Sequence, residues 1–261
     1  MAKAIAHQLT QQGRHSLAAA SPSLTVGVNK DQIRTHHDNK EIIKEAEIII
    51  LAVKPMQMSL VLKEIMPILP PGCLLISVAA GLNLSWFAKH CGANQAVIRT
   101  MPNTPASVGL AATPMIANKS TSSSQKKQAE VIFSQIGLIT WAENEDDMDT
   151  FTALSGSGPA YVFLFLESMI NAGVALGLNE SAAKTFTLQT CSGALKLAQN
   201  SDMSLNQLRT KVTSPGGTTA AALAVLNEQM EALILAAMNA AKNRAHELGA
   251  IDYSTILAEK P

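Results

Sequence analysis

The chain has 261 residues, 47% of them hydrophobic, and its 20 basic side chains balance its 20 acidic ones, so the formal net charge at pH 7 is zero. Zero net charge excludes the basic field that is typical of proteins binding nucleic acid or an anionic membrane, and it makes a small molecule the expected partner. Three scattered cysteines without C-x-x-C spacing, the lack of an apolar run of roughly 18 residues and the lack of a signal-peptide pattern predict a cytoplasmic protein with reduced thiols and no bound metal.

The first half of the chain alternates apolar runs with amphipathic stretches, beginning with a helical pattern from Met1 to Gln12. Helical spacing of apolar residues also predicts helices at Met58–Leu69 and Ser122–Ile136. This alternation is typical of a doubly wound, mostly parallel α/β sheet, so residues 1–144 are expected to form a Rossmann-like dinucleotide-binding domain. The expected strands are Ser16–Ala20, Glu47–Val53, Leu74–Ala80, Ala96–Thr100 and Leu138–Trp141.

The beginning of this pattern differs from that of a complete Rossmann half. Such a half opens with a strand, a glycine-rich turn and a helix, and the turn with the helix N-terminus holds the pyrophosphate. Here the helical pattern at Met1 comes first, without a strand or a G-x-G-x-x-G loop ahead of it. Either Met1 is internal to the natural chain, or the domain lacks part of its phosphate cradle.

After Asp146 the strand patterns stop, and long Ala- and Leu-rich helical patterns follow. Residues 145–261 are therefore expected to form an all-helical substrate and dimerisation domain. Its apolar content is high for helices exposed to water, which predicts a second subunit that covers them, in a homodimer or a larger oligomer of dimers. The expected helices are Phe151–Leu176, Ser181–Ala198, Thr218–Leu226 and Met230–Leu248.

Two loops rich in glycine and hydroxyl side chains precede helical patterns, LSGSGPAY at 154–161 and VTSPGGTT at 212–219. Glycines let a backbone approach a ligand, and the free N–H groups and the dipole of a helix N-terminus favour a carboxylate or phosphate. The ordinary alternative is a Pro-Gly turn followed by a threonine N-cap. Two such loops in one chain favour one shared ligand site. The candidate anion site in the second loop consists of Ser214, Gly216, Gly217, Thr218 and Thr219.

Open α/β sheets bind ligands beyond the carboxyl ends of their strands. The first expected strand ends in Ser21-Pro22-Ser23, with no acidic residue where an NAD-selective site places a carboxylate on the ribose 2′-hydroxyl. Small hydroxyl side chains can accept a 2′-phosphate instead, which favours NADPH over NADH. An ordinary Ser-Pro turn is an equal alternative.

Other strand ends carry further candidate cofactor residues. Lys54 and Pro55 follow one strand, where the proline fixes the backbone and the lysine is either a cofactor contact or simply solvated. Ala79 and Ala80 end the next strand, and side chains this small allow either a planar ring against the backbone or a tight strand-to-helix connection. Asn103 lies between two prolines in the string MPNTP, a stiff loop that suits an active-site wall or a domain hinge.

Taken together, these segments resemble the pyrroline-5-carboxylate reductases, which make proline by reducing a cyclic imine with NADPH or NADH. The resemblance extends from Met1 to about Gly249, and the family's first strand and GxGxM-type loop are the parts without a counterpart here. LSGSGPAY and the SPGG loop at this separation are highly specific, whereas LAVKP alone is not. The matching strings are LAVKP at 51–55, SVAAG at 77–81, RTMPNTP at 99–105, LSGSGPAY at 154–161 and VTSPGGTT at 212–219.

The resemblance implies residues for both ligands. A protonated imine held beside a nicotinamide needs position and charge rather than an obligatory base, so Thr219 is assigned a hydrogen bond to the ring nitrogen. Cofactor contacts are implied near Ser21 and at Asn39, Val53, Lys54 and Ala80. Contacts with the substrate, 1-pyrroline-5-carboxylate, which is converted to L-proline, are implied at Glu145, Thr152, Ser157, Thr218 and Thr219.

Two other functions remain open from the sequence. A β-hydroxyacid dehydrogenase would place a catalytic lysine on a helix of the second domain, for which Lys184 and Lys196 are candidates without glycine- or asparagine-rich flanks. A non-catalytic dimerising protein is the other possibility, if the missing glycine loop abolishes cofactor binding.

Overall fold

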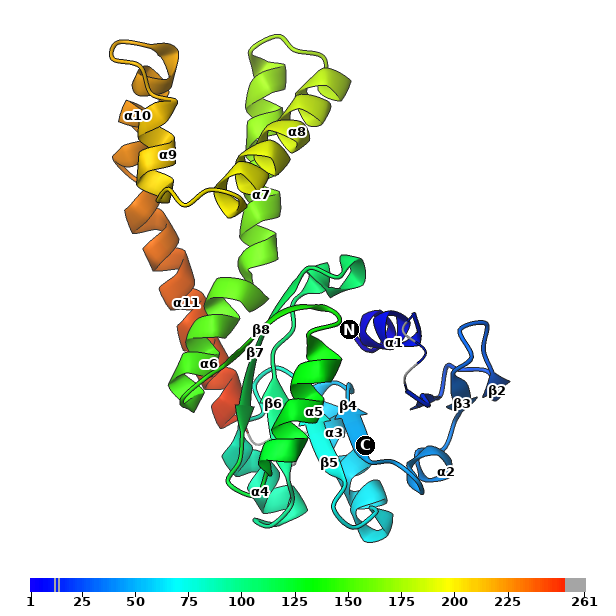
Figure 1. Ribbon diagram of the computed structural model, residues 1–261. Coiled ribbons are helices and arrows are strands. Elements are labelled where there is room, and N and C mark those ends of the chain that lie inside the picture. The colour runs from blue at the N-terminus through cyan, green and yellow to red at the C-terminus, as the bar shows by residue number, and fades with distance from the viewer. Residues whose placement is uncertain (12, 14, 252–261) are drawn as a thin grey trace, which may run out of the picture. The chain divides into compact units, whose positions relative to one another are not determined.

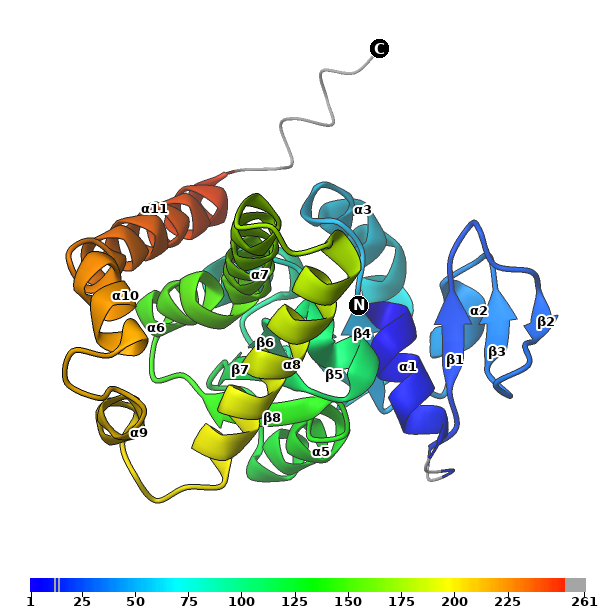
Figure 2. The same ribbon diagram turned by 90° about the horizontal axis from the view of Figure 1, so that it is seen from above.

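The computed structural model describes residues 1–11, 13 and 15–251, and two views of it are given in Figures 1 and 2. The expected α/β fold, a Rossmann-like half followed by helices, is confirmed. By compactness the chain forms two units. The first combines Met1–Ser157 with Ala240–Pro261, and the second is Gly158–Asn239.

The strands of the first unit form two sheets within the described part of the chain, with orders β1-β3-β2 and β4-β5-β6-β7-β8. All five expected strands are present, as β1, β4, β5, β6 and β8, and the sequence patterns missed the other three. The bounds are β1 Ala18–Ala20, β2 Gly27–Val28, β3 Arg34–His36, β4 Ile48–Leu51, β5 Leu74–Ser77, β6 Val97–Thr100, β7 Ala111–Ala117 and β8 Gly137–Trp141.

The larger sheet is parallel except at one pair, since β7 runs antiparallel to β6 and parallel to β8. Strand β7 was missed because Pro114 interrupts its pattern, and a proline normally argues against a central strand. Four consecutive residues of β7, Thr113 to Ile116, are nevertheless buried. A single doubly wound sheet was expected, but β1 pairs with β3 and β4 with β5, and no described pairing joins β1 to β4.

Six helices of the first unit surround the sheets within the described residues (Figure 1). The expected helix Met1–Gln12 is α1, and Gln12 lies outside the described residues. The patterns missed α2, α4 and α6, which are only four, eight and seven residues long. The bounds are α1 Ala2–Thr10, α2 Lys40–Ile43, α3 Pro55–Ile65, α4 Leu84–Cys91, α5 Ser123–Phe133 and α6 Glu145–Phe151, with short turns η1 Met66–Ile68, η2 Thr104–Val108 and the π-helical η3 Thr152–Gly156.

Alternate residues of β5 pack against helices on opposite faces of the large sheet. Leu74 and Ile76 belong to the core that contains Ile5 of α1, whereas Leu75 belongs to the core that contains Met58 of α3. Successive side chains of a strand point to opposite faces, so a strand covered on both sides must be apolar throughout. This explains why the continuous apolar runs were reliable strand signals.

The second unit consists of helices, and α11 runs on from it into the first unit. Its helix α9 was missed, although Ser204 and Gln207 form a capping box that starts it. Neighbouring helices α7 and α8 pack against each other. The bounds are α7 Gly158–Ala175, α8 Glu180–Gln199, α9 Leu205–Lys211, α10 Thr218–Asn227 and α11 Met230–Ala250.

Helix α7 leaves large apolar side chains exposed, including Phe163, which is 64% exposed. By length and composition the helical run Glu145–Ala175 suffices to cross a membrane, and so does the bent pair α10 and α11, among the residues the structure describes. The sequence pattern had indicated no membrane-length segment. Apolar faces of this kind are also typical of subunit interfaces.

The division by compactness differs from the expected boundary between residues 144 and 145. Helix α6 and the turn η3 stay with the sheet, and the end of α11 returns to it. Polar contacts give the physical reason: Arg99 of β6 pairs with Glu145 of α6, and Lys242 of α11 pairs with Asp146 of α6. Residues 252–261 of the expected second domain lie outside the described residues.

Candidate functional site

The predicted cofactor residues of the first unit follow the carboxyl ends of strands, as expected for this fold. Ser21 comes directly after β1, and its hydroxyl lies 3.1 Å from that of Ser23. Asn39 is the N-cap of α2 and donates a hydrogen bond from its side-chain amide to Glu64 Oε2 at 3.0 Å. Both serines therefore present hydroxyls at one turn, while the Asn39 side chain already has one partner.

The connection from β4 to α3 contains three predicted cofactor residues. Lys54 is exposed and occupies the N-cap of α3 in extended backbone conformation, and Pro55 is the first helical residue. Proline is preferred at this position because its missing N–H would have no acceptor inside the helix. Val53 is half-buried beside them. Lys54 has no ion-pair partner among the described residues.

The connection from β5 to α4 is a turn without bulky side chains at its start. Ala79 is buried, and its amide donates a hydrogen bond to Ser77 Oγ at 3.2 Å. Gly81 has a φ of +80°, which favours glycine, and a Cβ there would lie 3.1 Å from Cβ of Leu248. The end of α11 thereby packs directly on this turn. Ala80 lies between these two residues, half-buried.

Asn103 joins the loop after β6 to two other segments. Its amide group donates to the carbonyl oxygen of Ser155 at 2.9 Å, and its Oδ1 accepts from the amide of Ala112 at 3.0 Å. The same loop also approaches η3 through Met101, whose Cε lies 3.2 Å from where a Cβ on Gly156 would be. The structure therefore brings together two predicted site segments that are about fifty residues apart in the sequence.

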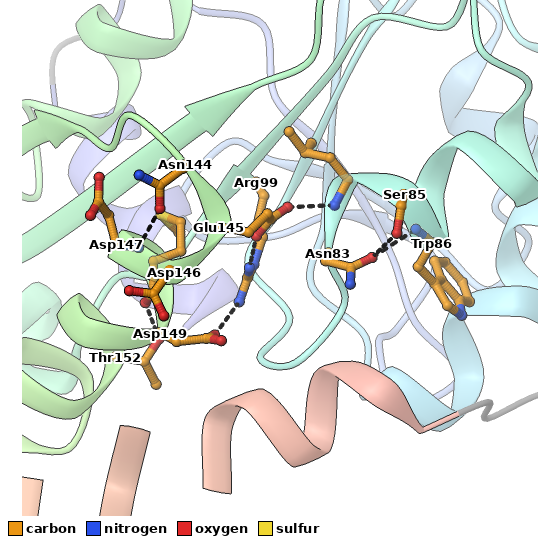
Figure 3. A network of polar contacts seen from close by, with 12 residues as sticks. Asn83, Ser85, Trp86, Arg99, Asn144, Glu145, Asp146, Asp147, Asp149 and Thr152 are labelled. Atoms are coloured by element: carbon orange, nitrogen blue, oxygen red, sulfur yellow. Dashed lines mark hydrogen bonds and ion pairs between the residues drawn. The ribbon is translucent and has the colours of Figure 1, made fainter. Parts of the chain in front are cut away.

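An ion-pair network centred on Arg99 joins β6 to α6 (Figure 3). The Arg99 side chain is 4% exposed, pairs with Glu145 Oε2 through one guanidinium nitrogen, and lies 3.8 Å from Asp149 Oδ1 through the other. The second oxygen of Glu145 accepts a hydrogen bond from the backbone amide of Leu84 at 2.6 Å. Both carboxylate oxygens of Glu145, a predicted substrate ligand, consequently have protein partners.

The same helix α6 also contacts the end of α11. Lys242 Nζ lies 2.7 Å from Asp146 Oδ2, and His246 Nδ1 lies 3.6 Å from Asp149 Oδ2. Sequence reasoning missed Arg99, although a charged residue inside the apolar run VIRT is a usable signal, because a buried charge requires a partner. No pattern indicated that α11 would supply Lys242 and His246.

The other predicted substrate residues of the first unit, Thr152 and Ser157, are the first residue of η3 and the residue that follows it. The amide of Ser157 donates to the carbonyl oxygen of Thr152 at 2.9 Å, an i to i+5 bond that defines a π-helical turn. Such turns often occur at functional sites. The hydroxyl of Thr152 donates to the carbonyl oxygen of Met148 at 2.8 Å. Thr152 is thus bonded within its own helix, and Ser157 begins the step into α7.

In the second unit, the loop before α10 is a tight turn that leads directly into a helix N-terminus. The amide of Gly217 donates to the carbonyl oxygen of Ser214 at 3.0 Å, and Gly216 has a φ of +71°. Pro215 precedes that glycine, so these four residues form a type II turn. Gly217 is the N-cap of α10, which rules out the alternative in which a threonine is the cap. Thr218 follows as the first helical residue.

The first backbone amides of α10 have no backbone acceptor among the described residues. Thr218, Thr219 and Ala220 donate no backbone hydrogen bond within the described part of the chain, and the first one in the helix comes from Ala221. Free N–H groups at the positive end of a helix dipole favour a carboxylate. Thr219 is half-buried and is the second residue of α10.

Other reactive side chains have ordinary surroundings. Lys184 and Lys196, the candidate catalytic lysines of a β-hydroxyacid dehydrogenase, are exposed on α8. Burial raises the pKa of the Cys73 thiol to about 11 and that of Cys91 to about 12, so both stay protonated at neutral pH. The cysteines are unpaired, as the sequence predicted.

Comparisons with known proteins give a consistent result over most of the chain. A family model described as pyrroline-5-carboxylate reductase dimerisation matches residues 145–248, and one described as NADP oxidoreductase, coenzyme F420-dependent, matches residues 1–81. The pyrroline-5-carboxylate reductase of Pseudomonas aeruginosa is 40% identical over 211 residues, which cover 80% of this chain and 77% of that protein.

Solved structures agree with these matches. A pyrroline-5-carboxylate reductase from Coxiella burnetii superposes with a TM-score of 0.89 at 37% identity, covering 96% of this chain and 95% of that one. The Plasmodium falciparum pyrroline carboxylate reductase with NADP bound superposes with a TM-score of 0.85 at 35% identity, covering 95% of this chain and 94% of that one.

Proposed function

Because this chain belongs to the pyrroline-5-carboxylate reductase family, we propose that it reduces the C=N bond of 1-pyrroline-5-carboxylate to give L-proline, with hydride from NADPH or NADH. The observation that carries this proposal is the agreement of sequence and fold along nearly the whole chain with a structure of the same family. The anion-site geometry at the start of α10 supports it independently, because the substrate carries a carboxylate.

The first unit offers residues that fit a pyridine dinucleotide. The turn after β5 is built of small residues, so Ala79 and Ala80 leave the backbone accessible to a planar ring. Lys54, Val53 and Pro55 line the neighbouring strand end, and Asn39 and Asn103 belong to adjacent connections. We assign these residues, with Ser21, to cofactor binding. When bound, the nicotinamide supplies the hydride.

The second unit offers the residues for the substrate. We propose that the free amides of Thr218, Thr219 and Ala220 bind its carboxylate, with Ser214, Gly216 and Gly217 shaping the turn before them. The hydroxyl oxygen of Thr219 then accepts a hydrogen bond from the protonated ring nitrogen, and we assign Thr152 and Ser157 to the substrate as well. A hydroxyl suffices in this role, since a protonated imine needs orientation more than a strong base.

We propose that the enzyme acts in the cytoplasm and assembles as a homodimer or as a larger ring of dimers. The exposed apolar side chains of α7 and the match to a dimerisation family support this assembly. Light scattering at micromolar concentration should give at least twice the mass of one chain, 27.6 kDa. A stable and active monomer is the result that contradicts the proposal.

The activity is tested by following NADPH absorbance while pyrroline-5-carboxylate is converted, with L-proline identified as the product. We expect consumption of one NADPH for each proline formed, and the Thr219→Ala variant serves as the matched control of lowered activity. A protein that binds NADPH but leaves the imine unreduced excludes this function.

Replacing Ser21 with aspartate should lower the affinity for NADPH more than the affinity for NADH. The serine hydroxyls at Ser21 and Ser23 lie at one turn, and a carboxylate there repels a 2′-phosphate that NADH does not carry. Fluorescence titration with both cofactors gives the two dissociation constants, and Ser21→Asn is the neutral control. An equal loss for both cofactors means that the 2′-phosphate binds elsewhere.

A further inference from the structure

We propose that Glu145 is a positioning residue for the cofactor site and does not touch the substrate. Its carboxylate joins Arg99 at the end of β6 to the backbone amide of Leu84 at the start of α4. It thereby holds the turn between β5 and α4 in place. This inference rests on the proposed function, because that turn is where we place the cofactor.

Each oxygen of the Glu145 carboxylate has a protein partner. Oε1 accepts from the Leu84 amide at 2.6 Å, and Oε2 pairs with the guanidinium of Arg99. One partner, Leu84, begins the helix that follows β5, and the other, Arg99, belongs to the neighbouring strand β6; they are 61 and 46 positions away in the sequence. Arg99 is almost fully buried, so its side chain is held in one orientation. Glu145 bonds both to Arg99 and to the first amide of α4, and it thereby fixes the position of the start of that helix.

The Leu84 amide needs such a partner. It lies in the first turn of α4, where backbone N–H groups have no acceptor inside the helix. The side chain of Asn83 is the N-cap, but its Oδ1 accepts from the amide of Trp86 at 2.8 Å. The Asn83 cap leaves the Leu84 amide without an acceptor, and Glu145 supplies that acceptor. Figure 3 shows both bonds converging on the first turn of α4.

The turn held in this way is packed tightly on its other side. Gly81 lies against Leu248 of α11, and the carbonyl oxygen of Gly81 lies 3.3 Å from where a Cβ on Gly249 would be. The turn is therefore clamped between α11 and the start of α4. If the hydrogen bond of the Leu84 amide is lost, the turn is held only by its packing against α11, and the backbone at Ala79 and Ala80 loses its fixed position.

The Glu145→Gln variant distinguishes the proposed positioning of the turn from a role of Glu145 in packing alone. Glutamine has nearly the shape of glutamate, but its single acceptor oxygen can occupy only one of the two positions that face Arg99 and the Leu84 amide, and its NH₂ group, a donor, occupies the other. Bonds to a charged donor are about twice as strong as neutral ones, so Arg99 takes that oxygen and the Leu84 amide loses its partner. Removing Arg99 as well, in Arg99→Met with Glu145→Gln, frees the oxygen for Leu84.

The experiment compares the wild type, Glu145→Gln and the double variant Arg99→Met/Glu145→Gln. Hydrogen exchange in peptides covering residues 79–86 reports on the turn, and NADPH fluorescence titration reports on the cofactor site. We expect Glu145→Gln to speed exchange there and to weaken NADPH binding about tenfold, with the KM for pyrroline-5-carboxylate within about twofold. The double variant should recover part of both losses. The control Asp146→Asn removes a charge of α6 whose side chain is 71% exposed and whose ion pair among the described residues is with Lys242, and it should alter neither readout.

Several results overturn the inference. One is unchanged exchange and unchanged NADPH affinity in Glu145→Gln, and another is a raised KM for the imine alone, which identifies a direct substrate contact. A double variant that binds NADPH no better than Glu145→Gln also contradicts it. If the wild type binds NADPH without reducing the imine, the proposed function fails, while exchange and NADPH affinity still decide the role of Glu145. A wild type that does not bind NADPH overturns the cofactor role itself.

Discussion

Replacing Thr219 with alanine should lower kcat/KM for pyrroline-5-carboxylate roughly tenfold to a hundredfold and leave the fold intact. The substitution removes one hydrogen bond to a charged group, which is worth on the order of 1.5–3 kcal/mol. The amides at the start of α10 and the Gly217 cap stay in place, because neither depends on the threonine side chain. Steady-state kinetics and a circular-dichroism melting curve measure the two effects.

The serine variant Thr219→Ser is the matched control for this prediction. It keeps a hydroxyl on the same carbon, so it should retain most of the activity. Thr218→Ala is a second control, because Thr218 contributes its backbone amide to the proposed carboxylate site and should tolerate loss of the side chain better. A melting temperature that falls in Thr219→Ala while the kinetics stay unchanged points to a structural role, and the imine partner is then to be sought at Thr152 or Ser157.

Replacing Arg99 with methionine should cost about 3 kcal/mol of unfolding free energy, among the larger effects that one substitution can produce. Methionine fills much of the arginine volume but leaves the carboxylates of Glu145 and Asp149 without their common cation. Asp149 is 8% exposed, so this charge stays poorly hydrated. The value lies at the lower end of the range for broken buried pairs, because the Glu145 side chain keeps 35% exposure. Urea unfolding gives the measurement.

A second variant in the same ion-pair network tests whether the loss of stability depends on the burial of the pair or only on the loss of a positive charge. Lys242→Met also removes a cation that pairs with α6, but its partner Asp146 has a 71% exposed side chain. An exposed pair contributes only about 0–1 kcal/mol, so this change should hardly shift the urea midpoint. Equal losses in Arg99→Met and Lys242→Met contradict the assignment of Arg99 as the buried centre of the network.

The sequence by itself determined the elements whose signals are local. The run Ile48–Leu51 is apolar at every position, and only a strand covered on both faces requires that pattern. The turn before α10 follows from its own residues, since Pro215 and Gly216 favour a type II turn and a glycine cap. Strings such as LSGSGPAY also carried the family assignment, because their residues and spacing are specific.

The tertiary structure alone decided which distant residues meet. Strand β7 forms despite Pro114, because burial between β6 and β8 outweighs the local preference. Arg99 and Glu145 are 46 positions apart, and Lys242 and Asp146 are 96 apart, so no periodic pattern links them. The period of apolar residues along a helix or strand shows which of its faces is apolar. The partner of a buried charge depends instead on how whole helices and strands pack together. For that reason Glu145 was predicted at the site, but its bonds to Arg99 and Leu84 were not.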